Sequence, residues 1–119
     1  MTNKKVLIIE DEPALLDMYT RKFENAGCTV FSAKDGETAV EMALREKPEY
    51  LVIDLFIPKK DGMEVLSELR TKLPNSKLII ATNLDQPEKE LEAKKNGADG
   101  YLLKAKYLPK ELVEKVLGF

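Results

Sequence analysis

The fold of this chain is decided by the segment Tyr50-Leu51-Val52-Ile53-Asp54, in which four mostly apolar residues are followed directly by a carboxylate. A short apolar run of this kind is typical of a strand that is covered on both faces, as in a parallel sheet. In open parallel sheets, ligands and reactive groups gather beyond the carboxyl ends of the strands. We therefore expect Asp54 at the reactive edge of such a sheet.

Three further apolar runs end in polar side chains in the same way. They are residues 5–9 before Glu10 and Asp11, residues 77–81 before Thr82, and residues 100–103 before Lys104. Because the carboxyl ends of parallel strands meet at one edge, all of these side chains are expected close to Asp54.

Helix-like patterns alternate with these runs and with a further strand at 29–33. The helices are expected to begin at Pro13, after Asp35-Gly36, after Gly62, at Pro87 and near Pro109. The second of them is expected to turn Ala39, Val40, Ala43 and Leu44 inward. Five strand–helix units with short connections predict an α/β fold, a doubly wound parallel sheet with helices on both faces.

The bulk properties predict one domain, residues 1–119, and exclude several functions. The net charge is −2, without the basic stripe of a nucleic-acid-binding domain. No run approaches the roughly 20 apolar residues of a membrane helix, so a cytoplasmic location is expected. The chain has no histidine and a single cysteine, Cys28, which rules out an internal disulfide.

Glu10, Asp11 and Asp54 together predict a metal site. Neighbouring strand ends lie about 5 Å apart, so three carboxylates there repel one another unless a cation is present. Oxygen ligands of this kind suit Mg²⁺, and the backbone carbonyl of Phe56 is a plausible further ligand. The alternative is that Glu10 and Asp11 only cap the following helix, but this does not explain Asp54.

Thr82 and Lys104 add a hydroxyl and an ammonium group to the same edge. Taken alone, each is an ordinary strand-end residue. Together with a carboxylate nucleophile and a metal ion, they are the parts of a phosphoryl-transfer site.

On these residues the chain resembles the receiver domains of two-component response regulators, in their single-domain form. The matching motifs are Glu10-Asp11-Glu12-Pro13, Asp54 with Pro58 and Asp61-Gly62, Thr82, and residues 97–104 ending in Lys104. The resemblance implies a flavodoxin-like (βα)5 fold with strand order 2-1-3-4-5. It also implies Mg²⁺-dependent transfer of a phosphoryl group from a histidine kinase to Asp54, by a switch protein that is not an enzyme beyond its own phosphorylation and dephosphorylation.

The resemblance further implies roles and partners. Glu10 and Asp11 hold the metal, Lys104 pairs with the phosphoryl group, and Thr82 and Tyr101 form the switch. The partners are a sensor histidine kinase or phosphotransfer protein and a downstream protein target, and a phosphorylation-dependent homodimer is a further option. The expected output face is made by the fourth helix, fifth strand and fifth helix, and includes Lys89, Glu92, Lys95, Tyr101, Lys106, Tyr107 and Lys110; the alternative for this charged face is that it is only solvated.

Three residues depart from the family pattern: Glu10 in place of aspartate, Asn83 in place of a small residue, and Ala105 in place of proline. Phe56 and Leu84 lie two positions after Asp54 and Thr82, where polar side chains orient an attacking water in other family members. Two apolar residues there predict slow hydrolysis of the phospho-aspartate.

Three other functions compete with the phosphorylation switch. A phosphatase or phosphomutase would need an acid at position 56, and a flavodoxin-type cofactor carrier would need a phosphate-binding loop after the first strand. A pseudo-receiver that docks without phosphorylation remains the main alternative because of Glu10 and Asn83. The sequence leaves open whether the receiver stands alone or is part of a longer protein.

Overall fold

The computed structural model describes residues 3–119, which form five strands, five α-helices and one short 3₁₀ helix. In chain order these are β1 (Lys5–Ile9), α1 (Pro13–Asn25), β2 (Thr29–Ala33), α2 (Gly36–Glu46), β3 (Tyr50–Ile53), α3 (Gly62–Lys72), β4 (Lys77–Thr82), α4 (Pro87–Lys95), β5 (Gly100–Leu103), η1 (Lys104–Lys106) and α5 (Pro109–Leu117). None of the helices in this part of the chain is long and apolar enough to span a bilayer.

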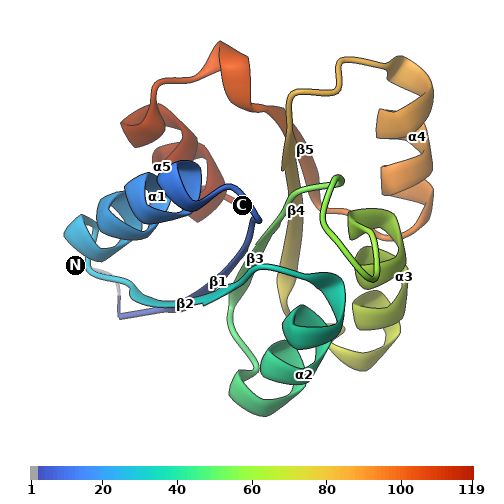
Figure 1. Ribbon diagram of the computed structural model, residues 1–119, viewed down its shortest axis with the longest axis horizontal. Helices are drawn as coiled ribbons and strands as arrows, with labels where there is room; N and C mark the ends of the chain where they lie inside the picture. Colours follow the sequence, from blue (N-terminus) through green and yellow to red (C-terminus); the bar gives the residue numbers. More distant parts are fainter. Residues whose placement is uncertain (1–2) are drawn as a thin grey trace.

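All five strands are parallel and lie in the order β2-β1-β3-β4-β5, which confirms the predicted topology (Figure 1). The register aligns the strand ends: Ile9 is opposite both Ala33 and Ile53, and Ile53 is opposite Ile80. The residues that follow β1 and β3 therefore emerge side by side at the carboxyl edge of the sheet.

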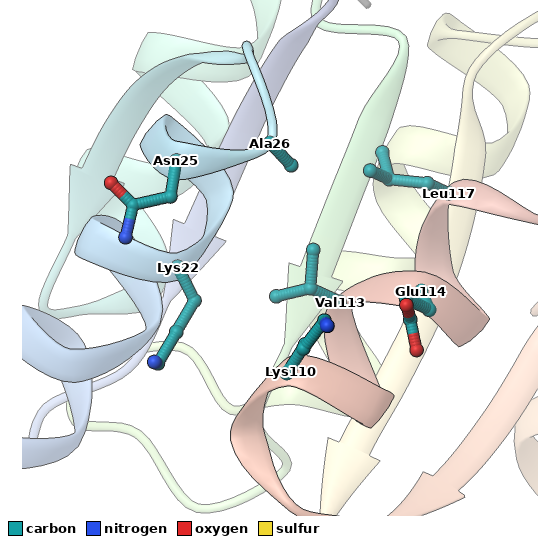
Figure 2. Close-up of a pocket in the computed structure, with 7 residues that line it drawn as sticks. All are labelled: Lys22, Asn25, Ala26, Lys110, Val113, Glu114 and Leu117. Atoms are coloured by element: carbon teal, nitrogen blue, oxygen red, sulfur yellow. The ribbon is translucent and has the colours of Figure 1, made fainter. Parts of the chain in front are cut away.

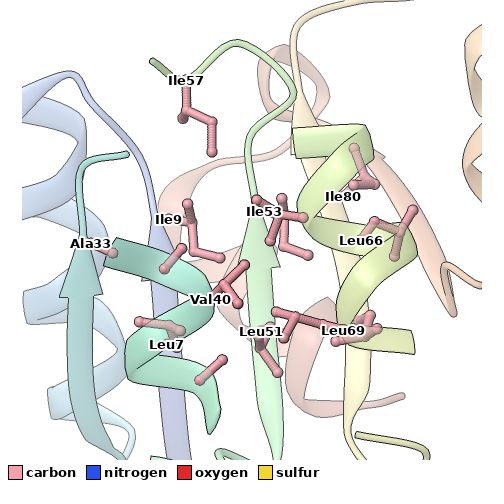
Figure 3. Close-up of a cluster of buried hydrophobic side chains, with 14 of the residues drawn as sticks. Leu7, Ile9, Ala33, Val40, Leu51, Ile53, Ile57, Leu66, Leu69 and Ile80 are labelled. Carbon is pink, nitrogen blue, oxygen red and sulfur yellow. The ribbon is translucent and has the colours of Figure 1, made fainter. Parts of the chain in front are cut away.

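Helices cover both faces of the sheet. On one face α1 and α5 lie against each other, and a shallow pocket of about 250 Å³ is lined by residues of both (Figures 1 and 2). On the other face α2, α3 and α4 enclose the larger hydrophobic cluster, in which strand residues such as Leu51 and Ile53 pack against Val40, Leu66 and Leu69 (Figure 3). β1, β3 and β4 are buried on both faces, as is typical of the inner strands of a parallel sheet.

Local sequence signals account for most of the helix ends. Pro13 opens α1 after Glu12, and Gly27, with a φ of 91°, follows its last turn. Asp35 caps α2 by accepting a hydrogen bond from the Thr38 N–H at 2.8 Å.

The prediction that Leu44 faces inward is wrong. Its side chain is 37% exposed, whereas Ala39, Val40 and Ala43 are buried. At 100° per residue, Leu44 lies roughly 90° from the centre of the buried stripe, so it falls at the edge of the helix face that packs on the sheet.

At the amino edge of the sheet, Arg70 joins the end of α3 to two loops. Its guanidinium donates hydrogen bonds of 2.9–3.0 Å to five acceptors, namely the carbonyls of Leu73, Pro74, Ser76 and Gly97 and the carboxylate of Asp99. Asp99 in turn accepts from the Leu78 N–H at 2.9 Å, so this cluster ties α3, β4 and the loop before β5 together.

Candidate functional site

Backbone hydrogen bonds fix the two central carboxylates at the carboxyl edge. The Asp54 N–H donates to the Ile9 carbonyl at 3.1 Å, and the Glu10 N–H donates to the Ala33 carbonyl at 3.0 Å. The parallel ladder thus continues one residue past β1 and β3. Both side chains therefore start from rigid backbone rather than from a loop.

The structure brings Glu10, Asp11 and Asp54 together as the sequence predicts. One carboxylate oxygen from each lies within 4.8 Å of the others. Glu10 is almost fully buried, Asp54 is at the limit of burial, and Asp11 is exposed. Carboxylate oxygens on one solvent-open and two buried residues suit a hard divalent cation that keeps several waters, which is the preference of Mg²⁺. The donor set therefore fits the expected metal.

Lys104 reaches this cluster from the end of β5, across the intervening strand β4. Its ammonium donates to Asp54 Oδ2 at 3.0 Å and also to Glu10 Oε1. The side chain of Lys104 is only 9% exposed, so both ion pairs are shielded from solvent. The lysine is the cation that balances these buried carboxylates within residues 3–119.

Burial and charge move the pKa values of this pair. Burial raises the pKa of Glu10 above its ordinary 4.5; Lys104 opposes this shift and the charge of Asp54 adds to it. Burial disfavours the ammonium form of Lys104, but the Glu10 hydrogen bond and the Asp54 charge outweigh it, so the pKa of Lys104 lies above 10.5. The three carboxylates of the cluster therefore carry more negative charge than the single ammonium of Lys104 can neutralise.

The loop after Asp54 closes tightly over it. The Phe56 N–H donates to Asp54 Oδ1 at 3.2 Å, and the Gly62 N–H donates to the Leu55 carbonyl at 3.0 Å. A Cβ on Gly62 would lie 2.2 Å from the Asp54 carbonyl oxygen, so only glycine allows α3 to begin this close to the site. The role of the Phe56 carbonyl as a metal ligand stays a prediction.

Thr82, Leu84 and Tyr101 are connected by hydrogen bonds. Thr82 is fully buried at the end of β4, and its Oγ1 accepts from the Leu84 N–H at 3.3 Å. The half-buried Tyr101 donates its hydroxyl to the Leu84 carbonyl at 2.6 Å. The predicted switch residues are thus linked through one loop residue.

Asn83 and Ala105 lie on the solvent side of the site. Both are exposed and help to line a pocket of about 270 Å³ that also contains Lys104. α1 contributes Leu15, Met18 and Tyr19 to this pocket. Neither departure from the family pattern blocks access to Lys104.

Sequence reasoning missed two features of the site. It did not predict the contact between the Lys104 ammonium and Glu10; the longer side chain of glutamate was the available signal. It also missed the Leu84 carbonyl as the acceptor of Tyr101, because a backbone acceptor leaves no trace in residue identity.

With this geometry the chain matches known proteins. The family model described as response regulator receiver domain matches residues 6–117. The alkaline phosphatase synthesis transcriptional regulatory protein PhoP of Bacillus subtilis (strain 168) is 33% identical over 114 residues, which cover 96% of this chain and 47% of that protein. This chain spans about half the length of the curated relatives it matches.

Solved structures agree. A CheY-like response regulator receiver domain protein from Methanospirillum hungatei JF-1 has a TM-score of 0.91 and 26% identity, covering 98% of this chain and 93% of that one. The BeF3-activated N-terminal receiver domain of RstA from Klebsiella pneumoniae has a TM-score of 0.88 and 26% identity, covering 95% of each chain. The chain belongs to the response regulator receiver domain family.

Proposed function

We propose that this domain is a phosphoacceptor switch whose nucleophile is the Asp54 carboxylate. The observation that carries the proposal is the Lys104 ammonium 3.0 Å from Asp54 Oδ2, inside a cluster of three carboxylates. A carboxylate held at a strand end beside a cation is poised to attack phosphorus. The Asp54 oxygen forms a bond to phosphorus while the bond from phosphorus to the imidazole nitrogen of a phosphohistidine breaks, and the released imidazole takes a proton from solvent.

The other residues of the site then have defined roles. Glu10, Asp11, Asp54 and the Phe56 carbonyl would hold Mg²⁺, which when bound neutralises charge on the phosphoryl oxygens. Lys104 pairs with the phosphoryl group after transfer, and the Thr82 hydroxyl donates to one of its oxygens. Tyr101 then moves together with Thr82, because both side chains are hydrogen-bonded to the backbone of Leu84.

The partners follow from the chemistry and the relatives. The donor is a sensor histidine kinase or a phosphotransfer protein, and the target is a downstream protein that reads the α4–β5–α5 face. α4 buries only Ala93, which suits an element that shifts on phosphorylation. The domain works in the cytoplasm, without direct nucleic-acid contact, and turns over no substrate other than its own phosphoryl group; dimerisation on phosphorylation is part of the same proposal.

A pseudo-receiver that docks without phosphorylation is the second candidate. It is favoured by Glu10, because this carboxylate holds Lys104 in the absence of a phosphoryl group. The two candidates differ in one measurable property, the formation of a covalent phospho-aspartate.

Incubation with acetyl phosphate and Mg²⁺, followed by intact-mass measurement, separates them. The switch predicts one added phosphoryl mass that requires Mg²⁺, is absent in Asp54→Ala, and persists in Asp85→Ala, an exposed aspartate near the same edge. An adduct in Asp54→Ala, or none in the unaltered chain, would contradict the switch.

The same assay tests the lifetime of the phosphoryl group. Phe56 and Leu84 line one pocket of about 120 Å³ between the loops after β3 and β4. We predict slow hydrolysis, accelerated in Phe56→Asn and Leu84→Glu because polar groups there orient water. Rapid hydrolysis that neither substitution changes would refute this explanation.

A further inference from the structure

The loop between β3 and α3 contains a strained turn, which begins two residues after Phe56. The Lys60 N–H donates to the Pro58 carbonyl at 2.9 Å, which closes a three-residue γ-turn around Lys59. Lys59 has a φ of 70°, in the left-handed region that residues other than glycine rarely adopt. Such a turn persists only where the surrounding structure holds it in place.

The first residue of α2 holds this turn. The Gly36 N–H donates to the same Pro58 carbonyl at 3.1 Å. A Cβ on Gly36 would lie 1.9 Å from the Lys60 carbonyl oxygen, whereas real Cβ atoms stay 3.0 Å or more from such neighbours. Gly36 does not have a positive φ, so the close approach of the turn, and not a special backbone conformation, is what requires glycine here.

α3 also holds the turn, through an ion pair. The Lys60 ammonium donates to Glu68 Oε1, and Lys72 donates to Oε2 of the same carboxylate at 2.9 Å. These two hydrogen bonds lower the pKa of Glu68, so its carboxylate stays ionised and keeps the pair formed. Ile57, just before the turn, is buried in the larger hydrophobic cluster (Figure 3). The turn is therefore fixed against both α2 and α3.

The position of the turn determines the position of the backbone that faces Asp54. Only Ile57 separates Pro58 from Phe56. The Phe56 N–H donates to Asp54 Oδ1, and the Phe56 carbonyl is the expected metal ligand. Mg²⁺ demands near-octahedral geometry with ligand distances of about 2.0–2.1 Å, so a small displacement of one ligand weakens binding. Residues that orient a metal ligand without touching the metal typically change the affinity by about 10- to 100-fold.

We propose that Gly36 and Glu68 are positioning residues for Phe56: they hold the turn at residues 58–60 and thereby direct the Phe56 carbonyl towards the acidic cluster. Neither residue belongs to that cluster. A Cβ at position 36 would displace the Lys60 carbonyl by about 1 Å, and the loop would carry Phe56 with it. This inference rests on the proposed phosphoacceptor function with its Mg²⁺ site, and it adds that α2 and α3 set the affinity for the metal.

The test is a calorimetric Mg²⁺ titration of the 119-residue chain, with Mg²⁺ as the only addition. We expect Gly36→Ala to bind Mg²⁺ about tenfold more weakly, while α2 persists because alanine is a good helix former. Asp35→Ala removes the cap of the same helix without touching the turn, so it should lower stability and leave the Mg²⁺ affinity unchanged. Gly118→Ala is the matched glycine control, because its Cβ would make only an ordinary contact at 3.4 Å.

Lys60→Met tests the contact with α3 while Gly36 stays in place. Methionine keeps the aliphatic stem and removes the ion pair with Glu68, so we expect Mg²⁺ binding to weaken about twofold. Loss of a positive charge alone would tighten Mg²⁺ binding, so weaker binding has the sign of lost positioning. Unchanged binding in Gly36→Ala, or equally weakened binding in Asp35→Ala, would overturn the proposal. If Gly36→Ala does not fold, unchanged binding in Lys60→Met would overturn it.

A spectrum recorded without metal separates positioning from a general loss of stability. In ¹H–¹⁵N spectra of the Mg²⁺-free protein, the backbone amide signal of Phe56 should shift in Gly36→Ala. The same signal should stay in place in Asp35→Ala and Gly118→Ala. An unshifted Phe56 signal in Gly36→Ala would overturn the role of Gly36.

The acetyl phosphate assay on the unaltered chain distinguishes failure of this inference from failure of the proposed function. Phosphorylation at Asp54, together with unchanged Mg²⁺ binding in Gly36→Ala and Lys60→Met, would refute only the positioning role. Absence of both Mg²⁺ binding and phosphorylation in the unaltered chain would refute the proposed function and this inference with it.

Discussion

Two cationic side chains hold the two edges of this sheet: Arg70, which is partly buried, at the amino edge, and Lys104, which is largely buried, at the carboxyl edge. Their hydrogen-bond partners are of different kinds. At the amino edge, four of the five acceptors of Arg70 are backbone carbonyls. At the carboxyl edge, Lys104 binds two carboxylates, those of Glu10 and Asp54. A partly buried carbonyl that loses its donor gains at best a water molecule, whereas a carboxylate can take a metal ion or a phosphoryl group in place of the lysine. Arg70 therefore fixes the fold, and Lys104 is held in a way that can be exchanged.

The largest expected effect is the loss of stability in Arg70→Ala. Removal of the guanidinium leaves several carbonyls without a donor, so we expect the free energy of unfolding to fall by about 3 kcal/mol. Urea unfolding measures this loss, which should be the same with and without Mg²⁺. Arg21→Ala is the control: its exposed ion pair with Asp17 should contribute less than about 0.5 kcal/mol. Equal losses in the two variants would mean that Arg70 does not hold the amino edge of the sheet.

A smaller loss of stability, which depends on Mg²⁺, is expected for Lys104→Met. Without metal, Glu10 and Asp54 lose their charge-assisted hydrogen bonds from Lys104, and we expect the free energy of unfolding to fall by about 2 kcal/mol. Saturating Mg²⁺ should recover most of it, because the metal replaces the ammonium as counterion. A loss that Mg²⁺ does not change would mean that Lys104, like Arg70, is purely structural.

The next expected effect is a loss of about 1 kcal/mol in the free energy of unfolding when either of two tyrosines loses its hydroxyl. Tyr101 donates to the Leu84 carbonyl at the carboxyl edge, and Tyr50 donates to the Leu117 carbonyl at 3.2 Å at the end of α5. Tyr101→Phe and Tyr50→Phe should lose similar stability, since each removes one hydrogen bond to a carbonyl. Only Tyr101→Phe should alter the backbone amide signal of Leu84 when a phosphoryl mimic is added. If both tyrosine variants alter this response alike, Tyr101 is not part of the switch.

The smallest expected effect is a pH dependence of opposite sign for two glutamates. Burial raises the pKa of Glu10, so its folded state binds the proton more tightly than the unfolded state does. Its contribution to stability therefore falls as pH rises from 4.5 through the raised pKa, and Glu10→Gln should gain stability relative to the unaltered chain over that window. Hydrogen bonds from Lys60 and Lys72 lower the pKa of Glu68, so the ionised form is favoured in the folded state. Glu68→Gln should therefore lose relative stability as pH rises through the lowered pKa towards 4.5 and above; the same sign for both variants in urea unfolding would contradict these assignments.

Much of the fold could be predicted because local and long-range signals agree. The continuous apolar run before Asp54 and the glycines and prolines at helix ends indicate strand and helix boundaries without knowledge of packing, and Gly27 and Pro87 lie where those signals predict. The prediction for Leu44 is wrong because successive residues of a helix point about 100° apart, so a residue at the edge of the buried face of α2 can turn to solvent while its neighbour Ala43 is buried. Arg70 could not be recognised, since four of its five acceptors are backbone carbonyls that any sequence supplies.

The candidate site divides in the same way. The grouping of Glu10, Asp11, Asp54, Thr82 and Lys104 follows from strand ends alone, because parallel strands bring their carboxyl ends to one edge. Which oxygen receives the lysine depends on side-chain length and on the distance across three strands. That information is in the packed structure, which gives Lys104 a second partner, Glu10, besides Asp54.

The most direct test of whether the carboxyl edge responds to a phosphoryl group while the amino edge stays fixed is a backbone ¹H–¹⁵N spectrum. It is recorded before and after addition of Mg²⁺ and beryllofluoride, a phosphoryl mimic. We predict shifts at Phe56, Leu84 and Tyr101 and unchanged signals at Gly97 and Asp99, which Arg70 holds. The shifts should be absent in Asp54→Ala. An unchanged spectrum of the unaltered chain, or the same shifts in Asp54→Ala, would contradict the account.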